Sequence, residues 1–408
     1  MRRVFAGFVS AMVLATLLAV PSPARAAASP GITLGALPAA PAFDGQPCGH
    51  PASADWTCPH GNRCSFLHSC TGDAPDPTIA KAGSIYLAVT TGTALGNGLQ
   101  ILESSSPDQG YHGWALTTCD HGGQFEPCPQ RWGSSAFGPN NAGLAKRDLP
   151  GSQTSPDLAF INGSWHLYFN SMTTKSSYNC LEVAVLNPAF AGQGKSVTIP
   201  TSTNDPIFKV ASGPPLACSP PPQFATSTGL VDPSAVIDQG APGGPAARLL
   251  YKANDGSSPA PAYLLSQALT SDGLRLTGPV AELLTNDTVQ RPWEKTVENP
   301  SMIPDGGSWL LLFSAGLWYS SNYSEAVAVC QSPSGPCTQP SSRLLRSFPS
   351  AAGPAGGSFF QVGPSSYDIA IAAWDPSCIG YTSDSHGSSP PGCTTGARQL
   401  FVVPVTVH

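Results

Sequence analysis

The chain has 408 residues, of which only 11% are charged, and its net charge is -6. It therefore lacks the basic face that nucleic acids or acidic membrane surfaces require, and a neutral, polar ligand suits it better. Its 42 Gly and 43 Pro follow no collagen-like period, which is typical of short strands joined by tight turns. The composition predicts an all-β protein.

The N-terminus has the pattern of an export signal. An apolar stretch from Val4 to Val20 follows two arginines, and Ala24-Arg25-Ala26 fits a signal peptidase site. We expect residues 1–26 to be a signal peptide and the protein to be secreted, extracellular and free of the membrane after cleavage. A membrane anchor is the alternative, but the stretch is short and interrupted by polar or small residues.

Three segments follow the signal peptide. Residues 27–47 are rich in Ala, Pro and Gly and are predicted to be a flexible leader. A Cys-rich N-terminal segment is expected at 48–71. The remaining residues, 72–408, are numerous enough for one large all-β domain, which we expect to act as a monomer.

Twelve cysteines in an exported chain indicate disulfides rather than catalytic thiols. A zinc site is the alternative for the N-terminal cluster, which also holds three histidines, but export favours disulfides. Sequence cannot fix connectivity, and local pairs are the favoured arrangement. These pairs are Cys119 with Cys128, Cys180 with Cys218, Cys330 with Cys337, and Cys378 with Cys393, beside Cys48, Cys58, Cys64 and Cys70 in the N-terminal cluster.

Along 72–408 one pattern of elements recurs. Each unit has a polar or Asp-Pro turn, a short apolar strand, a Gly-containing turn, and a second strand of aromatic and aliphatic residues. The spacing is about seventy residues, as expected for four-stranded propeller blades with long loops. The units begin at Asp76-Pro77, Ser155-Pro156, Val231-Asp232-Pro233, Glu298-Asn299-Pro300 and, in degenerate form, Gly357-Ser358.

Five units predict a five-bladed β-propeller, stapled by disulfides. A two-domain β-sandwich is the structural alternative. The terminal strand, 399–405, has no hairpin partner in the sequence and is expected to close the ring by pairing with an early blade.

Acidic residues stand early in four of the units: Asp76, Asp157, Asp232 and Glu298. The innermost strand of each blade lines the central channel of a propeller, so these side chains are expected to share one cavity. A single Asp-Pro is more simply a turn. Three grouped carboxylates are costly to bury and are therefore more often functional.

These segments resemble glycoside hydrolase family 43, whose members are five-bladed propellers. The resemblance covers Asp76 to Val407 and rests on the order and spacing of weak motifs. They are Asp-Pro-Thr-Ile followed by Tyr86-Leu87, Gly229-Leu230-Val231-Asp232-Pro233-Ser234, Val297-Glu298-Asn299-Pro300-Ser301-Met302 followed by Phe313-Ser314-Ala315-Gly316, and Ala326 to Pro336.

The resemblance implies a role for each carboxylate. Asp76 would be the general base that activates water, and Glu298 the general acid that protonates the leaving oxygen. Asp232 would orient the acid and keep it protonated, because a neighbouring anion disfavours ionisation. Asp157, Trp318 and Trp374 are the predicted substrate contacts.

The chain also departs from the family pattern. Gly353-Pro354-Ala355-Gly356 stands where the family shows Gly-Pro-Gly-His, whose His helps to hold a central metal ion. The resemblance therefore does not carry over a central calcium ion, and no cofactor is expected to be required. Thr154 stands where a stacking Trp is common, and Ala372-Ala373 replaces a Tyr-His pair.

The expected function is hydrolysis of O-glycosidic bonds in a plant-type polysaccharide or oligosaccharide, such as arabinan, arabinoxylan or xylan, by an inverting single displacement. Two alternatives stay open. One is a carbohydrate-binding propeller without catalysis, favoured by the altered blade-five turn and the missing aromatics. The other is a fructan-active hydrolase of the related fold, whose usual Asn-Asp-Pro, Arg-Asp-Pro and Glu-Cys are not matched here.

Overall fold

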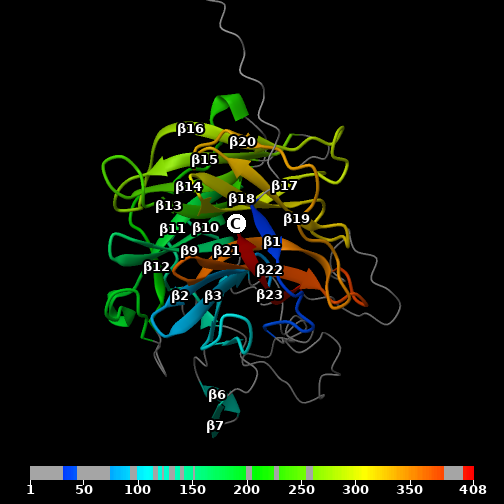
Figure 1. Cartoon of the computed structure of the whole chain (residues 1–408). Helices are drawn as coiled ribbons and strands as arrows, with labels where there is room; N and C mark the ends of the chain where they lie inside the picture. The colour runs from blue at the N-terminus through cyan, green and yellow to red at the C-terminus, as the bar shows by residue number, and fades with distance from the viewer. Residues whose placement is uncertain are drawn as a thin grey trace, which may run out of the picture.

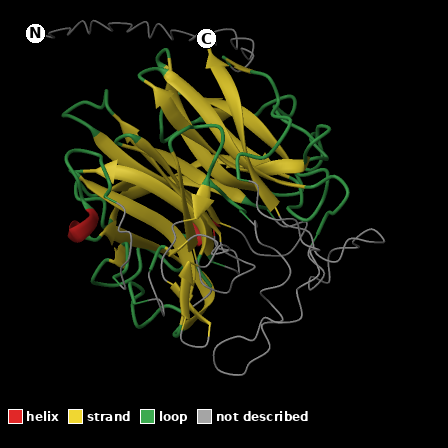
Figure 2. Ribbon diagram, turned by 90° about the horizontal axis from the view of Figure 1, so that it is seen from below, coloured by secondary structure: helices red, strands yellow, loops and turns green. Residues whose placement is uncertain are grey.

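The computed structural model describes residues 31–43, 74–91, 99–113, 118–121, 124–127, 134–137, 142–149, 152–198, 205–224, 229–253, 261–380 and 398–408. Within these ranges five antiparallel sheets follow one another around the molecule in chain order (Figure 1). Strands dominate the fold (Figure 2), and the helical segments described are two short 3-10 turns, Pro188–Phe190 and Pro222–Phe224. The predicted five-bladed β-propeller is confirmed. No helix in the described ranges is long and apolar enough to cross a membrane.

The sheets are the blades, and the first strand of each lies nearest the centre. Blade 1 contains β2 (Thr78–Ala82), β3 (Ile85–Thr91), β4 (Leu99–Ser104), β5 (His112–Gly113) and β8 (Ser134–Ser135). A separate hairpin of β6 (Thr118–His121) and β7 (Gln124–Pro127) follows β5. Blade 2 contains β9 (Thr154–Ile161), β10 (Ser164–Thr173), β11 (Ser176–Leu186) and β12 (Phe208–Val210).

The other three blades repeat this order. Blade 3 contains β13 (Leu230–Asp238), β14 (Ala246–Ala253), β15 (Tyr263–Leu269) and β16 (Leu276–Thr285). Blade 4 contains β17 (Val297–Asp305), β18 (Ser308–Ala315), β19 (Ser324–Cys330) and β20 (Cys337–Thr338). Blade 5 contains β21 (Ala352–Gly363), β22 (Ser366–Trp374), β23 (Arg398–Val407) and β1 (Ile32–Leu34).

The ring closes differently from the sequence-based expectation. The terminal strand β23 does not join an early blade but is the third strand of blade 5, and β1 pairs along its outer edge. Residues 31–43 are therefore not a flexible leader: Ile32, Ala42 and Phe43 are buried, and Phe43 forms a bridge with Leu400. Burial of the apolar residues of this segment against the edge and face of blade 5 removes apolar surface from water and so stabilises the fold.

Five hydrophobic clusters hold the blades together, one at each interface between neighbouring blades. Strand β18 shows why its run of apolar residues is continuous. Leu310 and Leu312 pack toward blade 5, whereas Leu311 and Phe313 pack toward blade 3. Successive side chains of a strand point to opposite faces, and here both faces are covered. Each such side chain contributes about 1.5–3 kcal/mol by leaving water.

Two of the expected disulfides lie in the described residues and are confirmed: Cys180–Cys218 in blade 2 and Cys330–Cys337 in blade 4. Cys378 is also disulfide-bonded. The signal peptide, the Cys-rich segment 48–71 and the expected partners Cys128 and Cys393 lie outside the described residues.

Candidate active site

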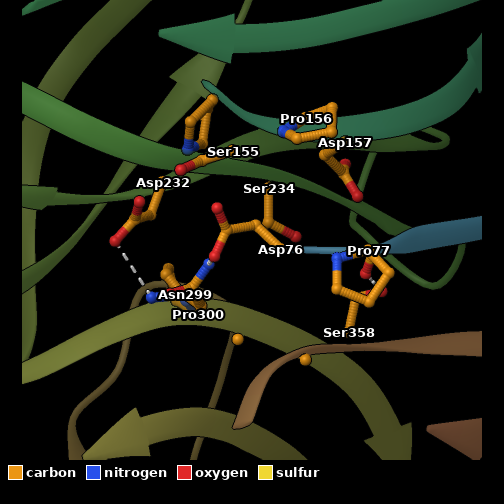
Figure 3. Close-up of a pocket in the computed structure, with 13 residues that line it drawn as sticks. Asp76, Pro77, Ser155, Pro156, Asp157, Asp232, Ser234, Asn299, Pro300 and Ser358 are labelled. Atoms are coloured by element: carbon orange, nitrogen blue, oxygen red, sulfur yellow. Dashed lines mark hydrogen bonds between the residues drawn. The ribbon is translucent and has the colours of Figure 1, made fainter. Parts of the chain in front are cut away.

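One residue in each blade occupies the same place at the channel. Asp76, Ser155, Asp232, Asn299 and Gly356 each come two positions before a strand residue that is paired in the same way with the second strand. All five have a positive φ, between 49° and 68°. We call them the ring residues. A cavity in the channel is lined by all five and by the residues that follow them (Figure 3).

The ring conformation is strained for every member except glycine. Residues other than Gly are rare at positive φ, and four non-Gly residues in this conformation at one site indicate a functional constraint. In blades 3 and 4 the strand register shifts just after Val231 and Glu298, so the extra residue there forms a bulge. A bulge re-aims its side chain, which is how Asp232 and Asn299 turn toward the channel.

This register corrects one sequence-based prediction. Asp157 and Glu298 do not occupy positions equivalent to Asp76 and Asp232. Asp157 follows ring residue Ser155 by two positions, and Glu298 precedes ring residue Asn299 by one. The five repeats align on the ring residues, four of which precede Pro, and not on the acidic residues.

Asp76 lies before β2 and accepts hydrogen bonds from two sides. Thr91 Oγ1 donates to its Oδ2 at 2.9 Å, and Asn299 Nδ2 donates to its Oδ1 at 3.5 Å. Arg398 Nη1 lies 3.8 Å from Oδ1. Burial raises the pKa of Asp76, and the lowering effects of Arg398 and Thr91 do not cancel it. A carboxylate with a raised pKa is a stronger base, which suits a group that must take a proton from water.

Asp232 is the second buried carboxylate of the ring. Its Oδ2 accepts the backbone N–H of Asn299 at 3.2 Å, as the dashed line in Figure 3 shows. Burial raises the pKa of Asp232 to about 7, although the nearby Lys252 opposes this and the charges of Glu298 and Asp76 add to it. The three carboxyl groups therefore lie close enough for the charge of each to act on the others.

Glu298 is held at both oxygens. Lys252 Nζ donates to Oε2 at 2.6 Å and Tyr323 Oη donates to Oε1 at 2.6 Å. The side chain of Glu298 is 11% exposed to solvent and that of Asp76 is 15% exposed, so both can be reached from solvent. Glu298 is not among the residues that line the channel cavity, although its chain neighbour Asn299 is.

A chain of hydrogen bonds links Asp76 to Glu298. The side-chain amide of Asn299 donates to Asp76, and Asn299 Oδ1 lies 3.3 Å from the hydroxyl of Tyr323. That hydroxyl also donates to Glu298. Asp76 and Glu298 come from blades 1 and 4, which blade 5 separates. The side chains of Asn299 and Tyr323 therefore lie between the two carboxyl groups.

The three predicted substrate contacts differ in their surroundings. Asp157 lines the cavity, but Thr78 Oγ1 and the backbone N–H of Ala235 occupy its two oxygens. Trp374 is fully buried and donates its Nε1–H to the Trp318 carbonyl. Trp318 is half-buried, and the guanidinium of Arg398 lies 5.4 Å from its ring centroid. Of the three, only Asp157 lines the cavity, and Trp318 is the one that keeps partial exposure.

The residues of blade 5 do not fit a central metal ion. Gly356 stands where the family shows its His, and a Cβ there would lie 3.1 Å from Asp76 Oδ1. Among the described residues no group of three or more His, Cys, Asp or Glu side chains is arranged to hold a metal.

Five residues of the site were missed in the sequence: Thr91, Lys252, Asn299, Tyr323 and Arg398. Asn299 could have been found by aligning the residues before Pro in each repeat. Thr91 and Lys252 lie at the ends of β3 and β14, whereas Tyr323 and Arg398 lie where β19 and β23 begin, and none of the four belongs to a recurring motif that would mark it.

The comparisons with known proteins agree with this fold. No known family profile matches the sequence, and no curated protein matches it. Among solved structures, the chain is similar to a thermostable family-43 glycoside hydrolase, with 16% identity, coverage of 82% of this chain and 93% of that chain, and a TM-score of 0.55. It is also similar to an endo-1,4-beta-xylanase from Bacteroides thetaiotaomicron (15% identity, 82% and 96% coverage, TM-score 0.52). An exo-1,5-alpha-L-arabinanase from a bovine ruminal metagenomic library gives 15% identity, 81% and 92% coverage, and a TM-score of 0.51.

Proposed function

We propose that the protein is a secreted glycoside hydrolase, of the family-43 type, that cleaves glycosidic bonds in plant-type glycans such as arabinan, arabinoxylan or xylan. The observation that carries the proposal is the group of three carboxylates, in which Asp76 and Glu298 come from separated blades and Asp232 lies beside them. The likeness to arabinan- and xylan-active structures supports it. The disulfides support export.

The proposed mechanism assigns one role to each group. Asp76 takes a proton from a water molecule, and its raised pKa strengthens it as a base. Glu298 gives a proton to the leaving oxygen. Asp232 places a negative charge near Glu298, which disfavours ionisation of the acid. Asp76 and Glu298 come from blades that are not adjacent, which favours an inverting single displacement, because that reaction needs carboxyl groups far enough apart to admit a water molecule.

The experiment is hydrolysis of linear arabinan, arabinoxylan, xylan and aryl furanosides by the purified protein. We expect release of sugars from at least one substrate, and a loss of several orders of magnitude in kcat for Asp76→Asn and Glu298→Gln with folding unchanged. Asp238→Asn, at the outer end of the same strand as Asp232, is the matched control and should keep full activity. Undiminished activity in both site variants would exclude this assignment.

A second candidate is a carbohydrate-binding propeller without catalysis. It is favoured by the engagement of both Glu298 oxygens and by the absence of Glu298 from the cavity lining. Calorimetry with arabino- and xylo-oligosaccharides would identify it by measurable binding without any product.

A further inference from the structure

One position on the second strand of each blade recurs, and in three of the five blades its side chain binds the start of the next blade. It lies two residues after the strand partner of Thr78, Asp157, Ser234, Ser301 or Ser358. We call it the clasp position. Its occupants are Thr91, Asn170, Lys252, Ser314 and Ala372.

Three of the clasp residues make the same hydrogen bond. Thr91 Oγ1 accepts the backbone N–H of Ser155 at 2.8 Å, Asn170 Oδ1 accepts that of Asp232 at 3.3 Å, and Ser314 Oγ accepts that of Gly356 at 2.8 Å. Each of these three clasps thus accepts the N–H of the ring residue in the following blade. This is a structural role, and it needs a side chain with an acceptor oxygen.

Lys252 cannot make this bond, because an ammonium group has only donors. The backbone N–H of ring residue Asn299 turns instead to Asp232 Oδ2. Lys252 reaches past it and donates to Glu298 Oε2 at 2.6 Å. A lysine that is 4% exposed is expensive to bury, so its presence at a position filled elsewhere by neutral groups requires another reason.

We propose that Lys252 is a positioning residue that fixes the orientation of Glu298 and sets the upper pH limit of activity. The inference rests on the proposed function of the same site. Lys252 passes no proton to Glu298 and touches no substrate. It acts through its charge and through one of the two hydrogen bonds that anchor the carboxyl group.

The charges around Lys252 support this role. Glu298 of β17 lies against it, Asp232 of β13 and Asp76 before β2 also attract it, and Tyr323 and Glu325 approach Glu298 from the far side. The residue opposite on β15 is the apolar Leu264. Burial tends to lower the pKa of Lys252, but attraction by Glu298 and then Asp232 outweighs it, so the pKa is raised. Lys252 therefore stays charged throughout the working range of a hydrolase.

The first test is the pH profile of kcat/KM for Lys252→Met and Lys252→Arg. Loss of an adjacent positive charge makes ionisation of a carboxyl group harder, so Lys252→Met should move the alkaline limb to higher pH by about one to three pH units. Lys252→Arg keeps the positive charge and should leave the alkaline limb at the wild-type pH. The matched control is Lys209→Met, which removes an exposed lysine on β12 of blade 2 and should leave the limb in place. An unmoved limb in Lys252→Met would overturn the proposal.

A second measurement needs neither turnover nor a folded Lys252 variant. The side-chain ¹⁵N resonance of Lys252 is followed with pH in the wild type and in Glu298→Gln. Without the Glu298 charge, burial should prevail and Lys252 should lose its proton at a lower pH than in the wild type. Equal midpoints would refute the pairing. If no glycan is hydrolysed but the midpoints differ, the proposed function fails while the coupling of Lys252 to Glu298 stands.

Discussion

Replacement of Glu325 by Gln tests whether burial in the blade core controls ionisation. Glu325 on β19 is fully buried, and its Oε1 accepts hydrogen bonds from Ser314 Oγ at 3.0 Å and Gly357 N–H at 2.8 Å. Its Oε2 has no hydrogen-bond partner among the described residues. Burial raises the pKa of Glu325 from 4.5 to about 8, despite these two hydrogen bonds.

The sign and size of the effect follow from this shift. Because the folded pKa is raised, the stability linked to Glu325 is fully present below pH 4.5 and is lost as the pH rises to about 8. Each pH unit in this window changes the free energy of unfolding by about 1.4 kcal/mol. At pH 7 the wild type should have lost roughly 3 kcal/mol through this group. Glu325→Gln keeps the Oε1 acceptor and cannot ionise.

Urea unfolding of both proteins between about pH 5 and pH 8 measures the difference. As the pH rises, the free energy of unfolding of the variant should increase relative to that of the wild type by about 1.4 kcal/mol per pH unit. The other buried carboxyl groups titrate alike in both proteins, so their contributions cancel. Glu282→Gln on the exposed face of β16 makes the same chemical change at the surface and gives the reference pH dependence. Parallel stability curves for the wild type and Glu325→Gln would show that the ionised form of Glu325 is not penalised by burial.

Three further outcomes are expected. Asp232→Asn should lower kcat and displace the pH optimum to lower pH, opposite in sign to Lys252→Met, because a charge that opposes ionisation of Glu298 is removed; a pH profile decides it, and an unchanged optimum would contradict the role. Proton NMR in the first moments of hydrolysis should show a product of inverted anomeric configuration, whereas retention or a glycosyl ester on Asp76 would contradict single displacement. Mass mapping without reduction should find six disulfides from the twelve cysteines, and two or more free thiols would instead favour zinc in the N-terminal cluster.

Much of the architecture could be predicted from local sequence. Strand signals and turns repeat five times, and the blades that they form bury both faces, so the apolar runs are long and easy to find. The Cys180–Cys218 and Cys330–Cys337 pairs could be predicted because each joins strands or loops of a single blade. Asp76 and Asp232 stand out because Asp-Pro recurs at the same place in two repeats.

What the sequence alone could not reveal depends on contacts between blades. Lys252 meets Glu298 although 46 residues separate them, and Asn299 meets Asp76 across 223 residues. Nothing in either local pattern specifies these distances. Likewise, β1 has no partner until β23, at the other end of the chain, is in place. The sequence determined the blades and the residue types that carry charge, since strand pairing and turns are local. The tertiary structure alone decided which of those charges meet, because closure of the ring brings together strand ends that are remote along the chain.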